Sequence, residues 1–188
     1  MCMTPRYLSG NILVAPPKIA DRRFNNSVIY VCNHSEAGAW GLILNKASNH
    51  PNSLVLQRIN VDVPNLPGEV YAGGPVNNSS IHFLHTSEVL SMETLVGPTG
   101  ICSSGDTGFL TEIMAGHFPE KFRMFLGLCS WAPGQLEGEI TGTPPWTKDH
   151  SWLTAPASEQ IVFDFDGMEQ WSAAVEYCAQ HTVRDWMN

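Results

Sequence analysis

The sequence is poor in positive charge. Ten lysines and arginines stand against eighteen aspartates and glutamates in 188 residues, which gives a formal net charge of −8. The bases are scattered, with local pairs only at Arg22-Arg23 and at Lys121 and Arg123. A protein that holds DNA through about 6–10 phosphate contacts would need most of these bases on one face. The charge therefore disfavours direct nucleic-acid binding by a monomer, although it does not exclude a small basic patch.

Regular cysteine spacing and long apolar runs are also missing. The five cysteines include no CxxC pair, and an odd, irregular set fits a reducing cytosol better than a disulfide framework. The first residues lack the apolar segment of about 7–15 residues that a signal peptide carries. No run approaches the roughly 18 apolar residues that cross a membrane. These absences predict a cytoplasmic protein that has no membrane partner.

The composition is that of a globular protein, with 43% hydrophobic and 15% charged residues. No internal repeat, low-complexity segment or long linker divides the chain. Because domains cluster at roughly 100–200 residues, we predict one domain over residues 1–188. A chain of this length buries about 70% of its unfolded surface, so it can form a sizeable core without disulfides or metal ions.

Short apolar runs separated by Gly, Pro and polar residues predict that strands dominate. The runs 27–32 and 39–44 are joined by a Gly-containing loop at 33–38, which is typical of a β-hairpin of central strands. Further strands are predicted at 11–15, 70–72, 81–85, 151–154 and 161–165.

Helices are few and irregularly placed, which favours an α+β fold over a regular βαβ alternation. A short helix is predicted over 53–59. A second is predicted over 106–116, with Phe109, Leu110, Ile113 and Met114 on one face. In the last helix, Asp166 and Glu169 have capping-box spacing, and an apolar stripe follows. That stripe consists of Trp171, Ala174, Val175 and Cys178.

The most distinctive segment runs from Phe125 to Ile140. It predicts a buried strand, a tight turn at Pro133-Gly134 and a short helix. The free N–H groups of such a helix start could hold an anion, but Glu137 and Glu139 already complement the helix dipole. The pattern Gly127-x-Cys129-x-Trp131 lacks the second glycine of a nucleophile elbow, so we interpret Cys129 as a buried structural residue.

Several blocks of the sequence occur together in a characteristic order. They are 8–16, 21–34, 36–46, 71–76, 83–85, 104–106, 127–137 and 161–171. In this combination the chain resembles the YqgE/AlgH family of bacterial proteins over about residues 8–177. The resemblance implies an α+β fold in which a split, curled β-sheet forms a barrel-like body with a few packed helices. It also implies that position 129 is usually a small, alanine-type residue, which further disfavours a catalytic cysteine.

The resemblance carries over no established activity and no catalytic residues. The family also bears the label of a transcriptional regulator, but this sequence supplies no helix-turn-helix or basic groove for that role. We therefore predict a cytoplasmic binding or regulatory module, whose ligand is a small molecule or a protein partner. Regulation through direct DNA contact is the weakest alternative.

The binding site is expected in a cleft between three segments of the family blocks: the loops at 34–38 and 73–75 and the strand-to-helix junction at 131–135. Its candidate cleft or signature residues are His34, Glu36, Gly38, Gly73, Gly74, Pro75, His85, Asp106, Ser130, Trp131, Gly134 and Gln135. The loop at 73–75 lacks the known phosphate-binding glycine patterns, so it is either a sharp bend between strands or a cleft wall. Trp146 and Trp152 flank a Pro-rich loop and Trp186 lies in the tail, so we expect one of them at a contact surface.

The main alternative is an enzyme acting on a small molecule through His34, His85, Asp106 or Ser130. It requires two of these side chains to approach to about 3 Å. No metal or cofactor is predicted. His82 and His85 are three residues apart on a predicted strand and so point to opposite faces. The stretch from Asp164 to Gly167 lacks the later ligands of a calcium loop.

Overall fold

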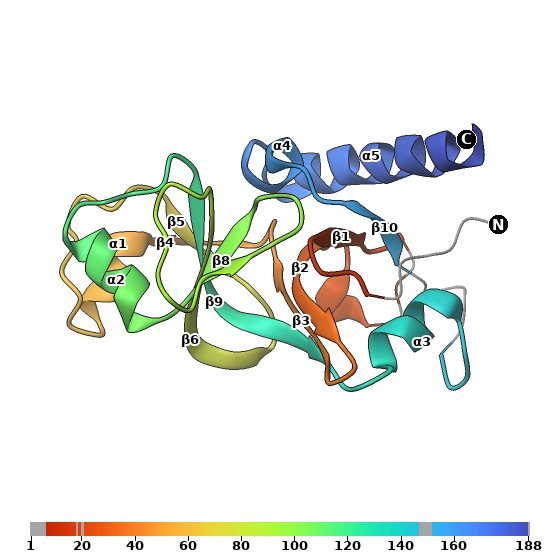
Figure 1. Cartoon of the computed structure of the whole chain (residues 1–188), viewed down its shortest axis with the longest axis horizontal. Helices are drawn as coiled ribbons and strands as arrows, with labels where there is room; N and C mark the ends of the chain where they lie inside the picture. The colour runs from red at the N-terminus through yellow and green to blue at the C-terminus, as the bar shows by residue number, and fades with distance from the viewer. Residues whose placement is uncertain (1–6, 18, 20, 147–151, 188) are drawn as a thin grey trace.

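A computed structural model describes residues 7–17, 19, 21–146 and 152–187. The strands form one curled sheet in the order β10-β1-β2-β3-β9-β6-β8-β7 (Figure 1). Off this path, β5 pairs with β9 and β4 pairs with β5. Their bounds are β1 (Asn11–Val14), β2 (Val28–Ser35), β3 (Gly38–Ile43), β4 (Ala47–Pro51), β5 (Glu69–Ala72), β6 (Val76–His85), β7 (Leu95–Val96), β8 (Cys102–Ser104), β9 (Phe122–Trp131) and β10 (Leu153–Pro156).

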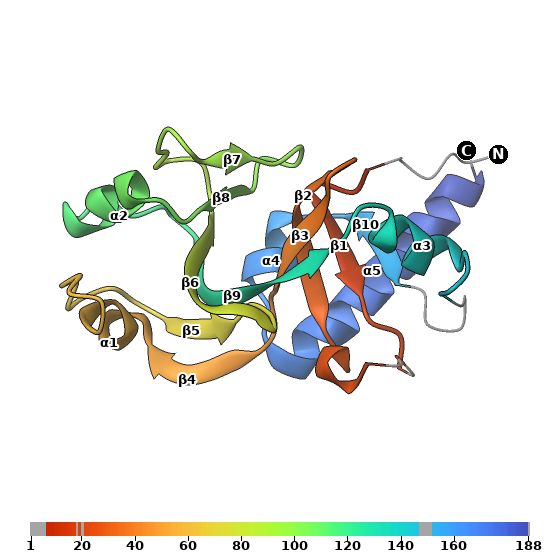
Figure 2. The same ribbon diagram turned by 90° about the horizontal axis from the view of Figure 1, so that it is seen from below.

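Strand β9 joins two halves of this sheet. Residues 129–131 pair antiparallel with β3, whereas residues 124–126 pair parallel with β5 and antiparallel with β6. Figure 2 shows β9 running from one half to the other. The change of partner occurs at Gly127, whose φ of +71° is a left-handed conformation that glycine adopts without steric cost. The split sheet expected from the family resemblance is therefore built on one bent strand.

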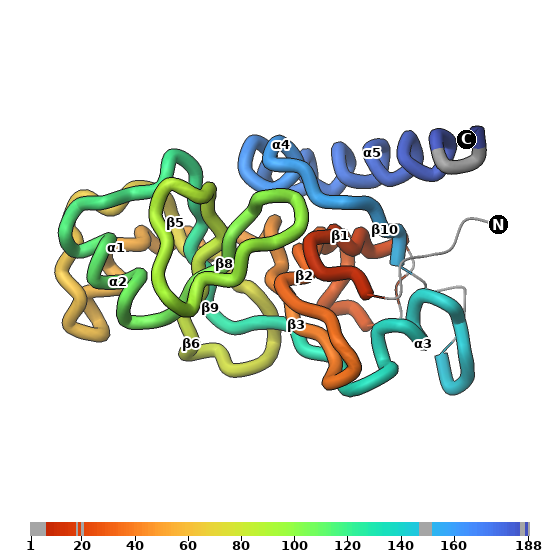
Figure 3. The backbone as a smooth tube through the Cα atoms, viewed as in Figure 1, coloured from red at the N-terminus to blue at the C-terminus, as the bar shows by residue number. Residues whose placement is uncertain are grey.

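The helices pack on both halves of the curled sheet. Helices α1 (Asn52–Gln57) and α2 (Thr107–Met114) lie in the half of β4–β8. Helices α4 (Glu159–Phe163) and α5 (Gly167–Met187) lie against β1, β2 and β10, and α3 (Gln135–Thr141) follows β9 (Figure 3). A 3₁₀ turn, η1 (Arg22–Phe24), precedes β2. Among the described residues, no helix has the length and apolar character needed to cross a membrane.

A buried arginine ties the C-terminal helices to the sheet. Arg123 of β9 is 8% exposed, and its guanidinium lies 4.8 Å from the centre of the Tyr71 ring. It donates hydrogen bonds to the Leu44 carbonyl, at 2.9 Å, and to the Gln170 side chain, at 3.1 Å. It also donates to two carbonyls at the end of α4, those of Phe163 and Phe165. The guanidinium thus caps α4 and links it to β9 and α5.

The α+β class and the curled sheet are confirmed, with local corrections. The predicted strand at 161–165 is wrong, because Ser158 accepts a hydrogen bond from the Ile161 N–H and starts helix α4. The predicted loop at 33–38 is shorter, since β2 continues to Ser35 and β3 begins at Gly38. In α2, Phe109 and Ile113 are buried as expected, but Met114 is 54% exposed.

Candidate functional site

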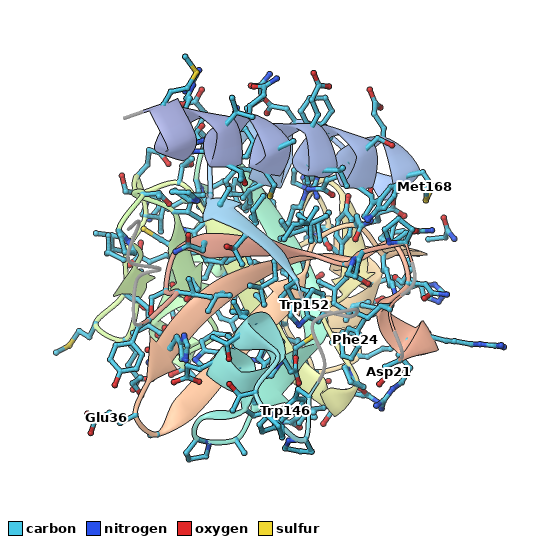
Figure 4. The ribbon with its side chains drawn as sticks, turned by 90° about the vertical axis from the view of Figure 1, so that its right-hand side faces the viewer. Asp21, Phe24, Glu36, Trp146, Trp152 and Met168 are labelled. Carbon is cyan, nitrogen blue, oxygen red and sulfur yellow. The ribbon has the colours of Figure 1, made fainter. Side chains whose placement is uncertain are left out.

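A cleft with a volume of about 470 Å³ lies between α3, η1 and the end of β9. We call it the tryptophan cleft. Figure 4 shows Asp21, Phe24, Trp146 and Trp152 gathered around it. Its apolar lining consists of Ile19, Phe24, Pro75, Val76, Trp131, Pro145, Trp146 and Trp152. Its polar lining consists of Asp21, Arg23, Cys129, Ser130, Gln135 and Glu139.

The carboxylate of Glu139 is the convergence point of the polar groups. Its Oε2 atom accepts the indole N–H of Trp131 at 3.1 Å and that of Trp152 at 2.9 Å. Its Oε1 atom accepts the side-chain N–H of Gln135 at 2.9 Å. Two aromatic rings from β9 and from the start of β10 are thereby oriented by one acid. Within the described residues, the donors that bind this carboxylate are all neutral.

The local sequence explains why Glu139 reaches the cleft. Gly134 starts α3 in a left-handed conformation, with φ of +75°. Gln135 and Glu139 are four residues apart and so share one face of the helix, while Leu136 is fully buried on another. Gln135 also accepts the Ala132 N–H at 3.0 Å, which closes the turn between β9 and α3.

Gly138 makes room for Trp146. A Cβ atom at this position would lie 2.2 Å from Cε3 of the Trp146 ring, closer than real contacts allow. The ring is therefore seated directly on the backbone of α3. This contact closes one side of the tryptophan cleft.

Substituting Gly138→Ala tests this contact. Alanine favours the helix by about 1 kcal/mol over glycine, so α3 is expected to persist. The added methyl must push the Trp146 ring off the helix. We expect Trp146 to become more exposed, seen as stronger acrylamide quenching of tryptophan fluorescence in a protein in which Trp40, Trp171 and Trp186 are phenylalanine and the buried Trp131 and Trp152 are kept. Thr141→Ala is the control, because Thr141 is exposed on the same helix and does not line the cleft. Unchanged quenching in Gly138→Ala would contradict the packing described.

The remaining ionisable groups of the cleft have defined partners. Arg23 pairs with Asp21 at 2.6 Å, and hydrogen bonds from Arg23 hold the pKa of that carboxyl below its usual range. Burial raises the pKa of the Cys129 thiol to about 12. At neutral pH this cysteine is a thiol, and the thiolate is the nucleophilic form. The interpretation of Cys129 as a buried structural residue agrees with this environment.

Four of the residues predicted from sequence line the tryptophan cleft: Pro75, Ser130, Trp131 and Gln135. Gly134 starts the helix beside them. Gly73 and Gly74 lie behind the wall, where a Cβ on either would meet the backbone of β9 at 2.2–2.3 Å. The loop at 73–75 is thus both a close-packed bend and, through Pro75, part of the wall.

His34 is a neighbour of the cleft. It is 4% exposed, and its Nδ1 atom accepts the Leu8 N–H at 3.0 Å. Since a backbone N–H can only donate, the ring proton is on Nε2, which lies 3.2 Å from Glu137 of α3. Gly38 packs against the Trp131 carbonyl, whereas Glu36 lies at the exposed hairpin tip, away from the labelled cleft side chains (Figure 4).

His85 and Asp106 belong to the other half of the sheet. His85 is fully buried, and burial lowers its pKa. Its Nδ1 bonds the Thr86 carbonyl at 2.8 Å and its Nε2 bonds the Ser104 hydroxyl at 2.9 Å. Ser104 continues through Thr94 and Ser91 to Asp106, at 2.7, 3.0 and 2.6 Å. His85 and Asp106 are thus joined by hydroxyl groups rather than in direct contact.

Asp106 itself caps α2. Its Oδ1 atom accepts the Phe109 N–H at 3.0 Å. Burial alone raises the pKa of this carboxyl, but the Ser91 hydroxyl and backbone N–H groups outweigh burial and lower it. A smaller cleft of about 210 Å³ is lined by Asp106, Ser104, His82 and Trp40 among others. Among the described residues, no group of three His, Cys, Asp or Glu side chains could hold a metal ion.

Sequence reasoning missed the residue at the centre of the cleft. Glu139 was assigned only to the helix dipole, although its four-residue spacing from Gln135 placed both on one face. Trp152 is 7% exposed and Trp146 is half-buried, and both contribute to the cleft. The side chain of Trp186 lies outside the described residues. Phe24 belongs to the family block at 21–34 but was not proposed as a cleft residue, because only folding brings η1 to α3.

Known proteins resemble this chain along nearly its whole length. A family model described as AlgH-like matches residues 12–182. A UPF0301 protein of Pseudomonas paraeruginosa is 37% identical over 178 residues, covering 91% of this chain and 88% of the relative. A UPF0301 protein of Gluconobacter oxydans is 40% identical over 174 residues, covering 89% of each chain.

Two solved structures share the fold. The solution structure of the AlgH protein from Pseudomonas aeruginosa has a TM-score of 0.72 at 34% identity, covering 94% of this chain and 91% of that one. The crystal structure of a protein from Corynebacterium diphtheriae has a TM-score of 0.70 at 26% identity, covering 93% and 88%. The sequence-based resemblance is confirmed, and the chain belongs to the AlgH-like family.

Proposed function

We propose that this protein is a non-enzymatic binding module whose ligand site is the tryptophan cleft. The observation that carries the proposal is the convergence of two indole N–H groups and an amide on Glu139 inside an aromatic cleft. The volume of about 470 Å³ falls within the roughly 300–1,000 Å³ of small-molecule sites. Such sites combine an apolar lining with a few placed polar groups, as this cleft does.

The chemistry of the lining favours binding over reaction. The Cys129 thiol has a pKa of about 12 and donates toward the Gly73 carbonyl at 3.6 Å. Glu139 is committed to three hydrogen-bond donors. His34, a candidate base, faces Glu137 rather than Ser130. A module that binds without converting its ligand acts by sensing or delivering it, which is the regulatory role we propose.

A small-molecule enzyme is the second candidate, favoured by the contact between Ser104 and His85. Because the Thr86 carbonyl requires a proton on His85 Nδ1, the Nε2 atom accepts the Ser104 hydroxyl proton, as a general base would. His85 is fully buried, and Ser104 is also bonded to Thr94. These features suit a structural hydroxyl network better than a nucleophile that must meet a substrate.

Direct DNA contact remains the weakest candidate, because several basic side chains are buried or paired with acidic residues. Arg123 is buried, Arg23 is paired with Asp21, and Lys121 contacts Asp164 at 2.8 Å and Glu159 at 3.4 Å. Arg6, Lys18 and Lys148 lie outside the described residues. The proposed place of action is the cytoplasm, supported by four buried free cysteines, at positions 32, 102, 129 and 178.

A thermal-shift screen of metabolites tests the binding proposal. A ligand at 100 times its Kd adds about 2.7 kcal/mol to the free energy of unfolding. For this length that raises Tm by roughly 5–10 °C. Ser130 is an exposed cleft residue, so Ser130→Phe should fill the cleft and abolish the shift while leaving the Tm of the free protein nearly unchanged.

Ser172→Phe is the matched control, because Ser172 is exposed on α5 and does not line the cleft. It should retain the full ligand-induced shift. A shift that persists in Ser130→Phe would place the ligand elsewhere, and silence across a broad panel would contradict a small-molecule site. Chemical conversion of the bound compound, lost in Ser104→Ala, would favour the enzyme instead.

A further inference from the structure

We propose that the tryptophan cleft selects a small organic cation, specifically an alkylated ammonium group carried on a compact apolar body. This inference rests on the proposed function, since it names the ligand class of the same site. It is carried by the charge and the hydrogen-bond capacity of Glu139 together with the surrounding aromatic rings.

The formal charge of the lining is negative. Asp21 and Arg23 neutralise one another through a two-atom contact in which Arg23 Nε and Nη2 both reach the carboxylate. Glu139 is then the uncompensated charge among the described lining residues, which leaves them with a formal charge of −1. The donors on Glu139 are neutral, and a bound cation would supply the missing counter-charge. The chain as a whole is acidic as well, at −8, which attracts cations at long range.

The aromatic lining favours the same class. Trp131, Trp146 and Trp152 line the cleft beside Phe24, whose ring meets Trp152 edge to face at 5.8 Å. The Arg23 guanidinium lies over the Phe24 ring at 5.9 Å, so the three tryptophans are the rings that remain for a ligand. The faces of indole and phenyl rings attract cations through their quadrupole. Aromatic cages combined with one carboxylate are how proteins hold ammonium groups that cannot donate many hydrogen bonds.

Hydrogen-bond capacity separates an alkylated ammonium from a guanidinium. An ionised carboxylate offers about four lone-pair sites. Glu139 uses three of them, two on Oε2 and one on Oε1. A guanidinium fork needs two free sites side by side, one on each oxygen. An alkylated ammonium is held by an opposite charge and by apolar contact, and it requires few hydrogen-bond acceptors. The Glu139 charge and the aromatic lining supply both of these interactions.

Three probes of matched shape test the inference: choline, its neutral isostere 3,3-dimethylbutan-1-ol, and the anion 3,3-dimethylbutanoate. Each is titrated into the full-length ¹⁵N-labelled protein. The readout is the pair of indole N–H signals of Trp131 and Trp152, because both groups donate to Glu139. We expect choline to bind at least tenfold more tightly than the alcohol, and the carboxylate to bind most weakly.

Glu139→Gln removes the charge and keeps the side-chain shape. It should lower choline affinity at least tenfold, to that of the alcohol, while alcohol affinity stays the same and so reports an intact cleft. Glu137→Gln is the matched control, because Glu137 is on the same helix but contacts His34 rather than the cleft. Glu137→Gln should leave the choline affinity within twofold of that of the unsubstituted protein. The comparison separates the effect of the Glu139 contact from the effect of losing one negative charge on α3.

The outcomes separate this inference from the binding proposal. Equal affinities for choline and the alcohol overturn the cation class and leave the binding module standing. Preference for the carboxylate overturns it as well and would assign selectivity to Arg23. Silence of all three probes overturns it, while the metabolite screen decides on the module independently. Tenfold tighter binding of a trimethyl-lysine peptide than of choline would overturn the small-molecule source and assign the cation to a protein partner.

Discussion

Replacing Arg123 by methionine is expected to lower the free energy of unfolding by about 3–5 kcal/mol, because several buried hydrogen-bond acceptors lose their donor. Methionine has a similar length and can fill the space of the side chain. It cannot donate to the carbonyls of Leu44, Phe163 and Phe165 or to the Gln170 side chain. Each acceptor left buried without a partner costs about 1–3 kcal/mol.

The hydrogen bonds lost are local, but their loss should lower the stability of the whole protein. Arg123 connects β9 to the end of α4 and to the first turns of α5, so its removal loosens the C-terminal helices from the sheet. Urea unfolding followed by circular dichroism measures the change, and Tm should fall by roughly 6–20 °C. Arg22→Met is the matched control, since Arg22 is exposed, and its cost should stay within about 0.5 kcal/mol. A cost below about 1 kcal/mol for Arg123→Met would contradict the assigned role.

Substituting Gly127→Ala is expected to destabilise the protein by about 2–5 kcal/mol. Two effects add here. A non-glycine residue in a left-handed conformation costs about 1–2 kcal/mol, and φ is +71° at this position. The new Cβ would also lie 2.6 Å from the Gly74 carbonyl oxygen, and overpacking of this kind costs about 1–3 kcal/mol. Because that oxygen belongs to the backbone, it cannot move aside as a flexible side chain would.

Gly100→Ala separates the two effects. Gly100 has a similar φ of +84°, but a Cβ there meets nothing within 4 Å. It should therefore show only the backbone cost of about 1–2 kcal/mol. The difference between the two variants, measured by urea unfolding, reports the contact between β9 and the loop at 73–75. Equal costs would mean that the bend of β9 tolerates a side chain and that the two halves of the sheet are not held together there.

The sequence predicted most secondary structure where a local signal was strong. The hairpin of β2 and β3, the short helix α1 and the helix capped by Asp106 each have a run or a cap that acts within a few residues. The segment 161–165 was misassigned because Ile161, Val162 and Phe163 favour strands as isolated residues. The cap at Ser158 and the burial of Ile161 and Val162 against the core decide for a helix.

Part of the candidate cleft also followed from sequence. The turn at Pro133-Gly134 and the family blocks directed attention to Trp131, Gln135 and Pro75, which line the tryptophan cleft. His85 and Asp106 were grouped with them because they also belong to blocks that resemble the family. The structure puts both in the other half of the sheet, since β8 pairs with β6 and not with β3.

By itself, the sequence determined the class of this protein: an acidic α+β chain of the AlgH-like family. Local propensity and the order of the family blocks are properties of neighbouring residues, so they can be read without a structure. Only the tertiary structure placed Glu139 between the indoles of Trp131 and Trp152. That meeting depends on the turn at Gly134, which folds α3 back beside β9, and on the pairing of β10 with β1, which holds Trp152 near α3. The position of β10 is set by strand pairing, which leaves no local trace in the sequence.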